Sequence, residues 1–316
     1  MKMNHTSTVL ITGGTGLVGT ALCPLLLEKK YNVIVLTRNI PGVNERLPGI
    51  QYAEWNIEKE TIDEAAIKKA DFIIHLAGAN VGEKRWTRGR KQEILASRTL
   101  SSALVVKALR EIPNNVSTVV SASAIGWYGE DFSKSTPFME DSPPAEGFLG
   151  ETCKAWEESI EPVKQLGKRL VKLRTGIVLS NRGGALREFK RPLNFGMATI
   201  LGGGKQIISW IHIEDICRMY AFVLEHEEIA GAVNAISPIP VSNKNLVLEL
   251  AKKMRGNFFI PVYVPAFVLK MVLGEMSIEV LKSTTVSNQK IRQAGFRYIY
   301  PTIEACIGHL IKESKI

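Results

Sequence analysis

Three glycines spaced three residues apart constrain the fold of this chain more than any other feature. Gly13, Gly16 and Gly19 follow a short apolar run in TVLITGGTGLVG, and apolar residues at helical spacing come next. In such a turn the first glycine permits a tight bend, the second lets the backbone approach a phosphate, and the third lets a helix pack on the strand. A pyrophosphate there meets free N–H groups at the positive end of the helix dipole. The stretch predicts a strand–turn–helix unit that binds a dinucleotide; the simpler alternative is a glycine-rich turn without a ligand.

The end of the next strand indicates which dinucleotide the chain binds. The run NVIVLT predicts a strand over residues 32–37, and Arg38 follows it directly. Sites that prefer NAD usually place an Asp or Glu there, where it accepts from the ribose 2′-hydroxyl. A guanidinium at this place can instead pair with a 2′-phosphate in a forked geometry. NADP(H) is therefore the expected cofactor, with NAD(H) less favoured, and an ordinary solvent-exposed arginine is the simpler explanation of Arg38.

Alternating strand and helix patterns predict an α/β fold with a doubly wound parallel sheet. Strand-like apolar runs occupy residues 8–12, 32–37, 71–78, 117–123, 169–175, 207–213 and 232–237. Helical patterns occupy residues 17–30, 63–70 and 91–111. The second half is rich in glycine, proline and basic residues, which indicates a smaller lobe. We expect a Rossmann domain of residues 1–172, to which 207–240 return, and a C-terminal substrate lobe of 173–206 and 241–316.

Cysteine usage and charge exclude several classes of protein. The four cysteines (Cys23, Cys153, Cys217 and Cys306) are scattered without the spacing of a metal site. No apolar run reaches the ~18–20 residues that span a bilayer. The net charge of +9 comes from Lys and Arg spread along the chain, without a recognisable nucleic-acid module. We expect a cytoplasmic protein without a metal, nucleic-acid or membrane partner, whose basic surface attracts an anionic small molecule.

Several motifs resemble one enzyme superfamily. The glycine turn resembles the extended short-chain dehydrogenase/reductases, and so do HLAGA (75–79), SASAIGWYG (121–129) and LRTGIVLS (173–180). A closer resemblance is to an atypical branch labelled epimerase family or nucleoside-diphosphate-sugar epimerase. Its motifs are RWTRGRKQEILASR (85–98), CKAWE (153–157), SWIHIEDICR (209–218), LGEM (273–276) and AGFRYIYP (294–301). The resemblance covers nearly the whole chain and implies an NAD(P)-binding Rossmann fold, and it leaves a homodimer as an option.

The resemblance implies an unusual catalytic site. Ser123 matches the superfamily serine, which polarises a substrate carbonyl, and Ser121 is the nearest competitor. The superfamily pairs a Tyr with a Lys four residues later, because the lysine lowers the tyrosine pKa and holds the nicotinamide ribose. That pair is missing here. With Cys153 at the lysine position the tyrosine position is Leu149, and with Lys154 it is Gly150.

Other residues are candidates for the same site. The branch has Cys in place of the lysine and Arg in place of a helix asparagine, which Arg98 matches. Tyr128 is either a substrate contact and proton donor or a packed tyrosine. Cys153 is a nucleophile or redox sensor if its pKa is lowered, and otherwise an apolar filler. Arg85 and Trp86 suit a phosphate or carboxylate of the substrate, or form a solvated loop.

The candidate cofactor-binding residues come from the glycine turn, the following strand ends and the branch motif. They are Gly13, Thr15, Gly16, Leu17, Val18, Gly19, Arg38, Asn56, Leu76, Ala77, Gly78 and Arg98. His75, His212 and Asp215 are expected to be structural, with Asp215 capping a helix. The predicted function is an NADP(H)-dependent oxidoreductase or epimerase acting on a small anionic or sugar-like substrate, including a sugar nucleotide. The alternative is a non-catalytic NADP(H)-binding sensor or partner-binding protein, and nucleic-acid binding is the weakest reading.

Overall fold

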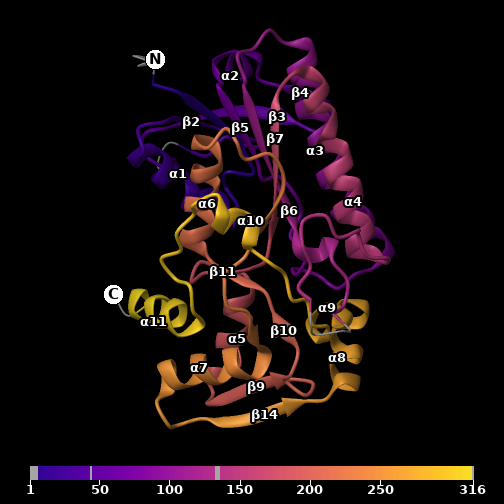
Figure 1. The fold of residues 1–316 in the computed structure, drawn as a ribbon, viewed down its shortest axis with the longest axis vertical. Helices are drawn as coiled ribbons and strands as arrows, with labels where there is room; N and C mark the ends of the chain where they lie inside the picture. The colour runs from indigo at the N-terminus through magenta and orange to yellow at the C-terminus, as the bar shows by residue number, and fades with distance from the viewer. Residues whose placement is uncertain (1–5, 43–44, 132–135, 315–316) are drawn as a thin grey trace.

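The computed structural model describes residues 6–42, 45–131 and 136–314. Its centre is an eight-stranded sheet with the order β12-β7-β6-β5-β1-β2-β3-β4 (Figure 1). The strands are β1 (Thr8–Thr12), β2 (Asn32–Thr37), β3 (Ile50–Asn56), β4 (Thr61–Ile62), β5 (Phe72–His75), β6 (Thr118–Ala124), β7 (Arg169–Thr175) and β12 (Gly231–Ala235). All neighbours pair in parallel except β3 and β4. The predicted doubly wound parallel sheet is confirmed.

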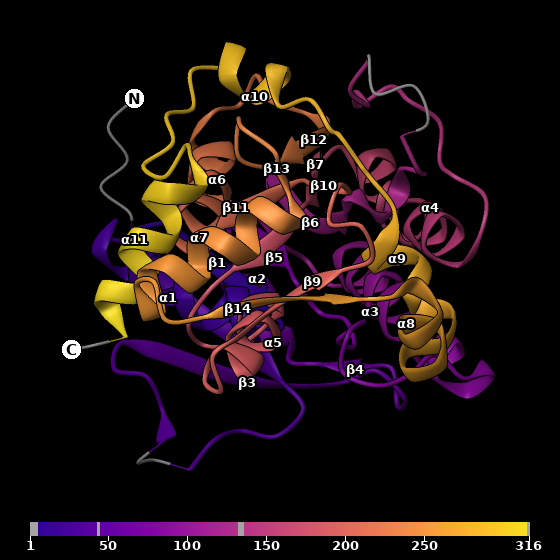
Figure 2. The same ribbon diagram turned by 90° about the horizontal axis from the view of Figure 1, so that it is seen from below.

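A smaller lobe lies at the carboxyl edge of the sheet (Figure 2). Its parallel strand pair is β9 (Met197–Leu201) and β14 (Ile260–Val264), packed on α5 (Ala185–Leu193), α7 (Asn243–Arg255) and α11 (Ile303–Glu313). Two short pairs join the lobe to the sheet: β8 (Ile177–Leu179) with β11 (Trp210–His212), and β10 (Ile207–Ile208) with β13 (Val241–Ser242). The segments α8 (Ala266–Leu273), η4 (Gly274–Met276), α9 (Ser277–Leu281) and α10 (Gln289–Gln293) follow β14.

The expectation of one strand over residues 207–213 is wrong. The chain bends at Ser209, whose side-chain hydroxyl donates to the Thr284 carbonyl at 2.8 Å while its own carbonyl accepts from Ile177 N at 3.0 Å. The two halves, β10 and β11, therefore pair outside the main sheet. Strand β7 also runs past residue 172. We propose to keep the division into a Rossmann domain and a C-terminal lobe, with the first boundary at the end of β7.

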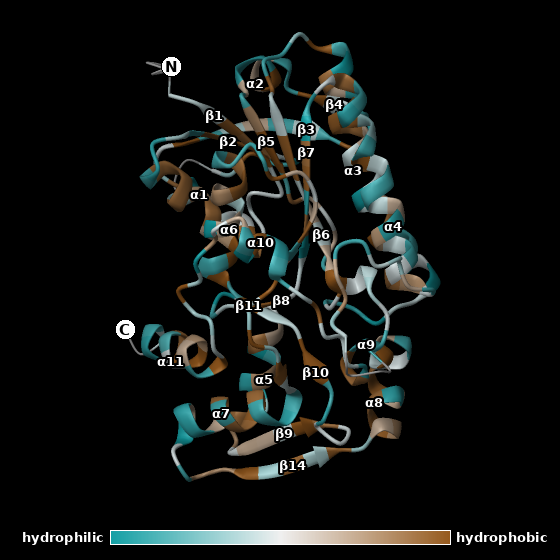
Figure 3. Ribbon diagram, viewed as in Figure 1, coloured by the Kyte–Doolittle hydropathy of each residue, from teal (hydrophilic) through white to brown (hydrophobic). Residues whose placement is uncertain are grey.

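The strands of the main sheet are mostly apolar (Figure 3), as expected where helices cover both faces of a sheet. All five residues of β1 are buried. Val9 and Ile11 belong to the core under α1 (Leu17–Glu28) and α6 (Ile213–Glu225). Leu10 points to the opposite core, under α2 (Glu64–Lys69), α3 (Arg88–Glu111) and the segment of α4 (Phe148–Ile160) with η3 (Glu161–Leu166). Side chains alternate along a strand, so one continuous apolar run supplies both cores.

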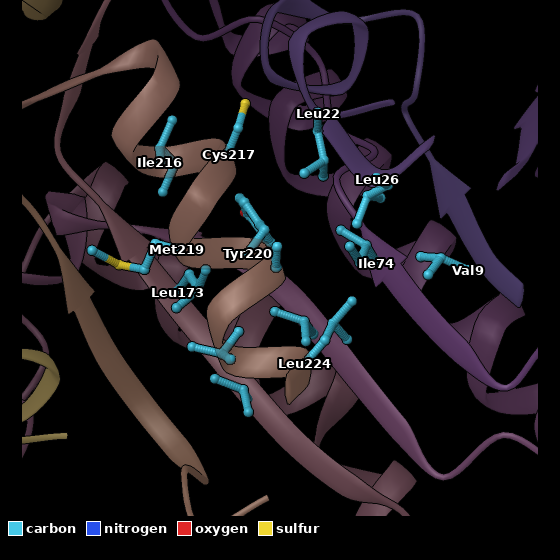
Figure 4. Close-up of a cluster of buried hydrophobic side chains, with 14 of the residues drawn as sticks. Val9, Leu22, Leu26, Ile74, Leu173, Ile216, Cys217, Met219, Tyr220 and Leu224 are labelled. Carbon is cyan, nitrogen blue, oxygen red and sulfur yellow. The ribbon is translucent and has the colours of Figure 1, made fainter. Parts of the chain in front are cut away.

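The core between α1 and α6 fixes the position of the glycine turn (Figure 4). Leu22 and Leu26 on α1 face Tyr220 and Leu224 on α6, above Ile74 of β5. These side chains are almost completely buried. Because α1 is held on both sides, its N-terminus stays at the carboxyl edge of the sheet. Within the described ranges no helix is long and apolar enough to cross a membrane, and no cluster of metal-ligand side chains is found.

Candidate cofactor and substrate site

The glycine turn leaves no room for side chains at two of its three positions. Gly13 has φ +67°, and a Cβ on it would lie 2.8 Å from the Leu76 carbonyl carbon. A Cβ on Gly19 would lie 2.5 Å from the Cα of Gly14. A Cβ on Gly16 would approach only the Gly13 carbonyl oxygen, at 3.3 Å, so its other side is open. The tight bend at Gly13 and the close helix packing at Gly19 match the predicted geometry of the turn, and the phosphate contact at Gly16 stays a prediction.

The N-terminus of α1 is free to bind an anion. Its N-cap is Gly16, which has no side chain to accept from the first-turn N–H groups, and the first turn contains no acidic residue. Four N–H groups at a helix start have no partner within the helix. Those of Leu17 and Val18 therefore remain available, with the positive end of the helix dipole behind them.

Arg38 and Asn56 lie at the ends of β2 and β3, beside this turn in the sheet order. Arg38 is exposed and has no hydrogen bond or ion pair with any described residue. The Asn56 side-chain oxygen accepts from Lys59 N at 2.9 Å, which leaves its amide N–H₂ group free within the described part of the chain. Arg38 thus has an unpaired guanidinium at the place where the sequence predicts a 2′-phosphate contact.

The segment after β5 is held rigidly against the turn. The Thr12 hydroxyl oxygen accepts from Leu76 N at 3.2 Å and Ala77 N at 3.3 Å, and the same hydroxyl contacts His75 Nδ1 at 2.7 Å. Complete burial lowers the pKa of His75 to about 4. His75 is therefore neutral near pH 7 and structural, as expected, and it keeps the Ala77–Gly78 backbone at the edge of the site.

Arg98 supports the same backbone from below. Its guanidinium donates to the carbonyls of Ile94 at 2.9 Å and Ala79 at 3.0 Å, and it lies 4.9 Å from the centre of the Trp156 ring. A Cβ on Gly78 would lie 3.2 Å from Arg98 Cζ. Burial lowers the pKa of Arg98 from its usual value, with a smaller opposite effect from Cys153. A cation thus lies next to Cys153, one of the two residues that the sequence leaves as candidates for the superfamily's lysine position.

The start of α4 distinguishes between the two registers for the missing Tyr–Lys pair. A Cβ on Gly126, in the short helix η2 (Ile125–Trp127) that follows β6, would lie 3.3 Å from Leu149 Cβ and 3.4 Å from Cys153 Sγ. Lys154 instead points outward and pairs with Glu158 at 3.9 Å. A Cβ on Gly150 would lie 2.0 Å from the Ala145 carbonyl oxygen, so no side chain fits there. Leu149 and Cys153 are therefore the pair that faces β6.

Cys153 is a protonated, buried thiol. Burial raises its pKa to about 12, although the nearby Arg98 acts in the opposite direction. A nucleophilic or redox-sensing role needs a lowered pKa, which this environment does not provide. The apolar-filler interpretation is the one that the geometry favours.

Ser123 and Tyr128 belong to one buried hydrogen-bond network. The Ser123 hydroxyl donates to Glu157 Oε1 at 2.8 Å, and Arg174 donates to the same carboxylate through Nε at 2.8 Å and Nη2 at 3.1 Å. Arg174 Nη1 also donates to the Tyr128 oxygen at 3.0 Å. The Tyr128 hydroxyl in turn donates to Asn234 Oδ1 at 2.7 Å.

This network decides between the two interpretations of Tyr128. The tyrosine is fully buried and stacks on Phe138 at 5.2 Å between ring centres. Burial raises its pKa above the usual value. The packed interpretation therefore fits, and the phenol faces β12 instead of the cavity. Ser121, the competitor of Ser123, donates to the Ala122 carbonyl at 3.1 Å.

A cavity of about 220 Å³ opens beside the ends of β6 and α4. Trp86 and Phe148 form one wall, with ring centres 4.8 Å apart and nearly perpendicular. Glu275, Ile278, Glu279 and Lys282 of the C-terminal lobe lie on the other side. The Trp86 indole N–H donates to the Val81 carbonyl at 2.9 Å, which fixes the ring.

Arg85 lies outside this lining. Its guanidinium packs on Gly274, where a Cβ would lie 2.7 Å from Arg85 Nε. Lys91 pairs with Glu275 at 2.6 Å nearby. These contacts tie the loop before α3, which carries Arg85, and the first turn of α3, which carries Lys91, to η4, so Arg85 lies at the junction between the two lobes. Of the two substrate candidates, the structure brings only Trp86 to the cavity wall.

Known proteins match this chain along almost its full length. Residues 9–152 match the family model described as the NAD dependent epimerase/dehydratase family, and residues 264–310 match a domain of unknown function (DUF1731). The epimerase family protein YfhF of Bacillus subtilis is 32% identical over 308 residues, which cover 97% of this chain and 99% of that protein. The chain belongs to the epimerase family.

Solved structures agree with this family. The crystal structure of human epimerase family protein SDR39U1 (isoform2) with NADPH has a TM-score of 0.84 and 27% identity, covering 96% of this chain and 99% of that one. The nucleoside-diphosphate sugar epimerase of Corynebacterium glutamicum has a TM-score of 0.76 and 29% identity, covering 97% of this chain and 58% of that one. The recognition of an atypical epimerase branch from the sequence motifs is confirmed.

Three residues near the expected site were not singled out from the sequence. Glu157 and Arg174 lie in CKAWE and LRTGIVLS, but only the fold brings them to Ser123. Arg182 lies in the glycine-rich turn after β8, where a Cβ on the neighbouring Gly184 would lie 3.2 Å from Leu17 Cδ2. The turn thus passes beside the N-terminus of α1. A basic residue directly before the glycine pair Gly183–Gly184 was the signal that could have found it.

Asp215 does not cap α6, contrary to the expectation. His212 is the N-cap residue, and its Nδ1 accepts from Glu214 N at 3.1 Å. The Asp215 carboxylate accepts from Ile299 N at 2.8 Å and Tyr300 N at 2.9 Å instead. It anchors the AGFRYIYP segment, so its role is structural as predicted, through a different contact.

Proposed function

We propose that this epimerase-family protein binds NADP(H) and acts as an oxidoreductase or epimerase on a small hydroxylated substrate. One observation carries the cofactor assignment: an uncapped helix N-terminus stands beside an exposed, unpaired arginine at the end of β2. Backbone N–H groups and a helix dipole suit a pyrophosphate, and a guanidinium suits a 2′-phosphate. The human relative described with NADPH supports the same choice.

The residues present fit this cofactor. The amides of Leu17 and Val18 would hold the pyrophosphate, with the Arg182 cation beside them, and Arg38 would hold the 2′-phosphate. The Ala77–Gly78 backbone, supported by Arg98, would run along it. When bound, the nicotinamide supplies or accepts a hydride, and the protein's task is to position it and handle a proton.

Ser123 and Glu157 would handle that proton. Both are almost completely buried and neither lines the cavity, but Ser123 lies three residues before Gly126, which does. The Ser123 hydroxyl hydrogen is committed to Glu157, so the serine oxygen can accept a hydrogen bond from a substrate hydroxyl. As that hydroxyl loses its proton to Ser123 Oγ, the serine proton passes to Glu157 Oε1. Arg174 holds the carboxylate in position throughout. Tyr128 is not part of the proposal, because its hydroxyl is engaged by Asn234 and Arg174.

The cavity lining favours a hydroxylated over a strongly anionic substrate. Glu130, Glu146, Glu275 and Glu279 line it, against a single lysine, Lys282. Lys282 also pairs with Glu279 at 2.7 Å. Carboxylates accept hydrogen bonds from sugar hydroxyls and repel other carboxylates. Of the two expected substrate classes, anionic and sugar-like, the lining favours the sugar-like one, and the sugar part of a sugar nucleotide remains within that class.

The alternative is a non-catalytic NADP(H)-binding sensor. It rests on Leu149 and Cys153, which supply neither a phenol nor a cation at the usual positions. Both proposals share the cofactor site and differ in turnover. Substitution of Ser123 therefore distinguishes them, as described in the Discussion.

The test of the cofactor site is a titration with NADPH and NADH, followed by nicotinamide fluorescence. Wild type should bind NADPH at least ~10-fold more tightly than NADH, since one charge-assisted contact contributes about this much. Arg38→Ala should abolish the preference by weakening NADPH alone. Arg182→Ala should weaken both cofactors equally, because both carry the pyrophosphate. Arg110→Ala, an exposed arginine at the far end of α3, is the matched control. Binding of neither cofactor by wild type would refute the proposal.

A further inference from the structure

The C-terminal lobe exposes a group of large apolar side chains. Phe195 and Phe258 are 82% and 87% exposed, and four others are between 64% and 70% exposed. We call this group the β14 surface: Phe195, Phe258, Ile260, Phe267, Met271 and Val272. Large exposed apolar patches on a protein mark interaction sites. Neither the cofactor site nor the cavity uses any of these residues.

Hydrogen bonds bring the first three residues to one side of the lobe. Phe195 lies just after the end of α5, and Phe258 lies just after the end of α7. Arg255 ties the two ends together, donating to the Leu193 carbonyl at 2.9 Å and to the Asn194 carbonyl. Ile260 N donates to the Gly196 carbonyl at 2.8 Å.

Strand β14 continues this surface into α8. Figure 2 shows β14 crossing the lobe in the view from below and leading to α8. Phe267, Lys270 and Met271 are three and four residues apart on α8 and are all exposed, so they share one face of the helix. From Phe258 to Phe267 the surface extends over roughly 30 Å of chain at ~3.3 Å per residue.

The same lobe carries an excess of positive charge. Segments 182–206 and 241–273 contain ten Lys or Arg and two Glu, an excess of eight, while the whole chain carries +9. Basic residues are spread along the whole sequence, whereas these two segments contain few acidic residues. Lys252, Lys253 and Arg255 end α7 directly before Phe258, and Arg191 lies four residues before Phe195.

Two features argue against a second copy of the chain as the occupant. Two such surfaces would bring like charges together, which is unfavourable at an interface. Strand addition is also hindered. The backbone groups of Ile260 and Val264 face β9, and successive residues of a strand direct their backbone groups to opposite sides. Those of Pro261 therefore face the free edge of β14, where proline offers no N–H group to an added strand.

We propose that the β14 surface docks on an anionic lipid bilayer. Exposed aromatic and aliphatic side chains insert into the boundary between headgroups and acyl chains, and adjacent Lys and Arg bind anionic headgroups. The protein lies on the membrane and does not span it. This replaces the sequence expectation of no membrane partner. Helix α8 leads directly to η4 and α9, whose Glu275 and Ile278 line the cavity, so docking holds the cavity close to the bilayer. The proposal does not depend on the proposed activity.

Co-sedimentation of the full chain with vesicles tests it. We expect wild type to sediment with vesicles of equal phosphatidylglycerol and phosphatidylcholine at 0.1 M salt (roughly physiological screening). Binding to pure phosphatidylcholine should be at least ~10-fold weaker, and high salt should reduce binding to the mixed vesicles. Phe258→Ser with Phe267→Ser, and separately Lys252→Ser with Lys270→Ser, should each weaken binding about tenfold or more.

Matched controls separate this surface from general stickiness. Leu100→Ser with Ile299→Ser removes two exposed apolar residues elsewhere, and Lys59→Ser with Arg110→Ser removes two exposed charges elsewhere. Both should bind within about twofold of wild type. An unchanged melting temperature and retained NADPH binding show that each variant is folded. Three results would overturn the proposal: wild type remaining in the supernatant, controls as defective as the surface variants, or a solution dimer that Phe258→Ser with Phe267→Ser dissociates.

Discussion

The two regions of the proposed site, the N-terminus of α1 and the ends of β6 and α4, differ in the groups that would contact a ligand. At the α1 end, backbone N–H groups would contact the cofactor, and glycines leave space for it because they have no side chains. At the end formed by β6 and α4, the proposed proton transfer depends on side chains. Leu149 and Cys153 lie there, where the resemblance leads us to expect the superfamily's Tyr–Lys pair. Backbone-dependent binding survives side-chain substitution, whereas proton transfer does not. Cofactor binding and chemistry should therefore be separable in this protein by mutation.

The largest expected effect is at the β6–α4 end. Glu157→Leu removes the carboxylate from a buried Arg174 and should lower the free energy of unfolding by about 4 kcal/mol, because an unpaired buried charge remains. Urea denaturation measures this, with Glu158→Leu, an exposed neighbour on α4, as the control. The folded fraction should still bind NADPH like wild type. A loss of cofactor affinity in correctly folded Glu157→Leu would show that the two ends are coupled.

At the α1 end, Gly19→Val should lower the free energy of unfolding by about 3 kcal/mol through overpacking against Gly14. Cofactor binding should be lost as well, since the helix N-terminus must move. Gly89→Ala is the control, because a Cβ there meets nothing within 4 Å. Wild-type NADPH affinity in Gly19→Val would mean that the turn does not form the site.

Ser123→Ala separates proton transfer from cofactor binding, because it removes one hydroxyl group and leaves the fold unchanged. Turnover of a substrate found by NADPH consumption should fall by a factor of about 10², while the dissociation constant of NADPH stays the same. Cys153→Ala should change turnover by less than about twofold, as expected for a packing residue. If Ser123→Ala leaves turnover unchanged, the proton passes elsewhere and the Ser123–Glu157 route is wrong.

The smallest effect concerns pH. His75 binds a proton near pH 6.5 when unfolded but only near pH 4 when folded, so the unfolded state holds more protons between these values. Stability contributed by neutral His75 is therefore complete above pH 6.5 and is lost on acidification towards pH 4, by about 1 kcal/mol at pH 5.5. His75→Gln should flatten this part of the stability profile in urea titrations. An equal slope in both proteins would assign the effect to other groups.

The strand, turn and helix at the α1 end could be predicted from the sequence because their determinants are local. A glycine turn specifies its own conformation, and the direction of the following strand places Arg38 without knowledge of distant contacts. At the β6–α4 end, the partners Ser123, Glu157 and Arg174 come from three elements. No local pattern shows that they meet, nor that Tyr128 turns towards β12. The break at Ser209 was missed for the same reason, since its cause is Thr284, 75 residues away.

The contact between Gly150 and the Ala145 carbonyl limits how conventional chemistry could return to this scaffold. A tyrosine side chain does not fit at residue 150. The standard pair could therefore be rebuilt only as Leu149→Tyr together with Cys153→Lys. The ammonium would then arrive beside the Arg98 guanidinium, and two neighbouring cations repel each other. A lysine at residue 153 should therefore be tolerated better when Arg98 is replaced by a neutral residue.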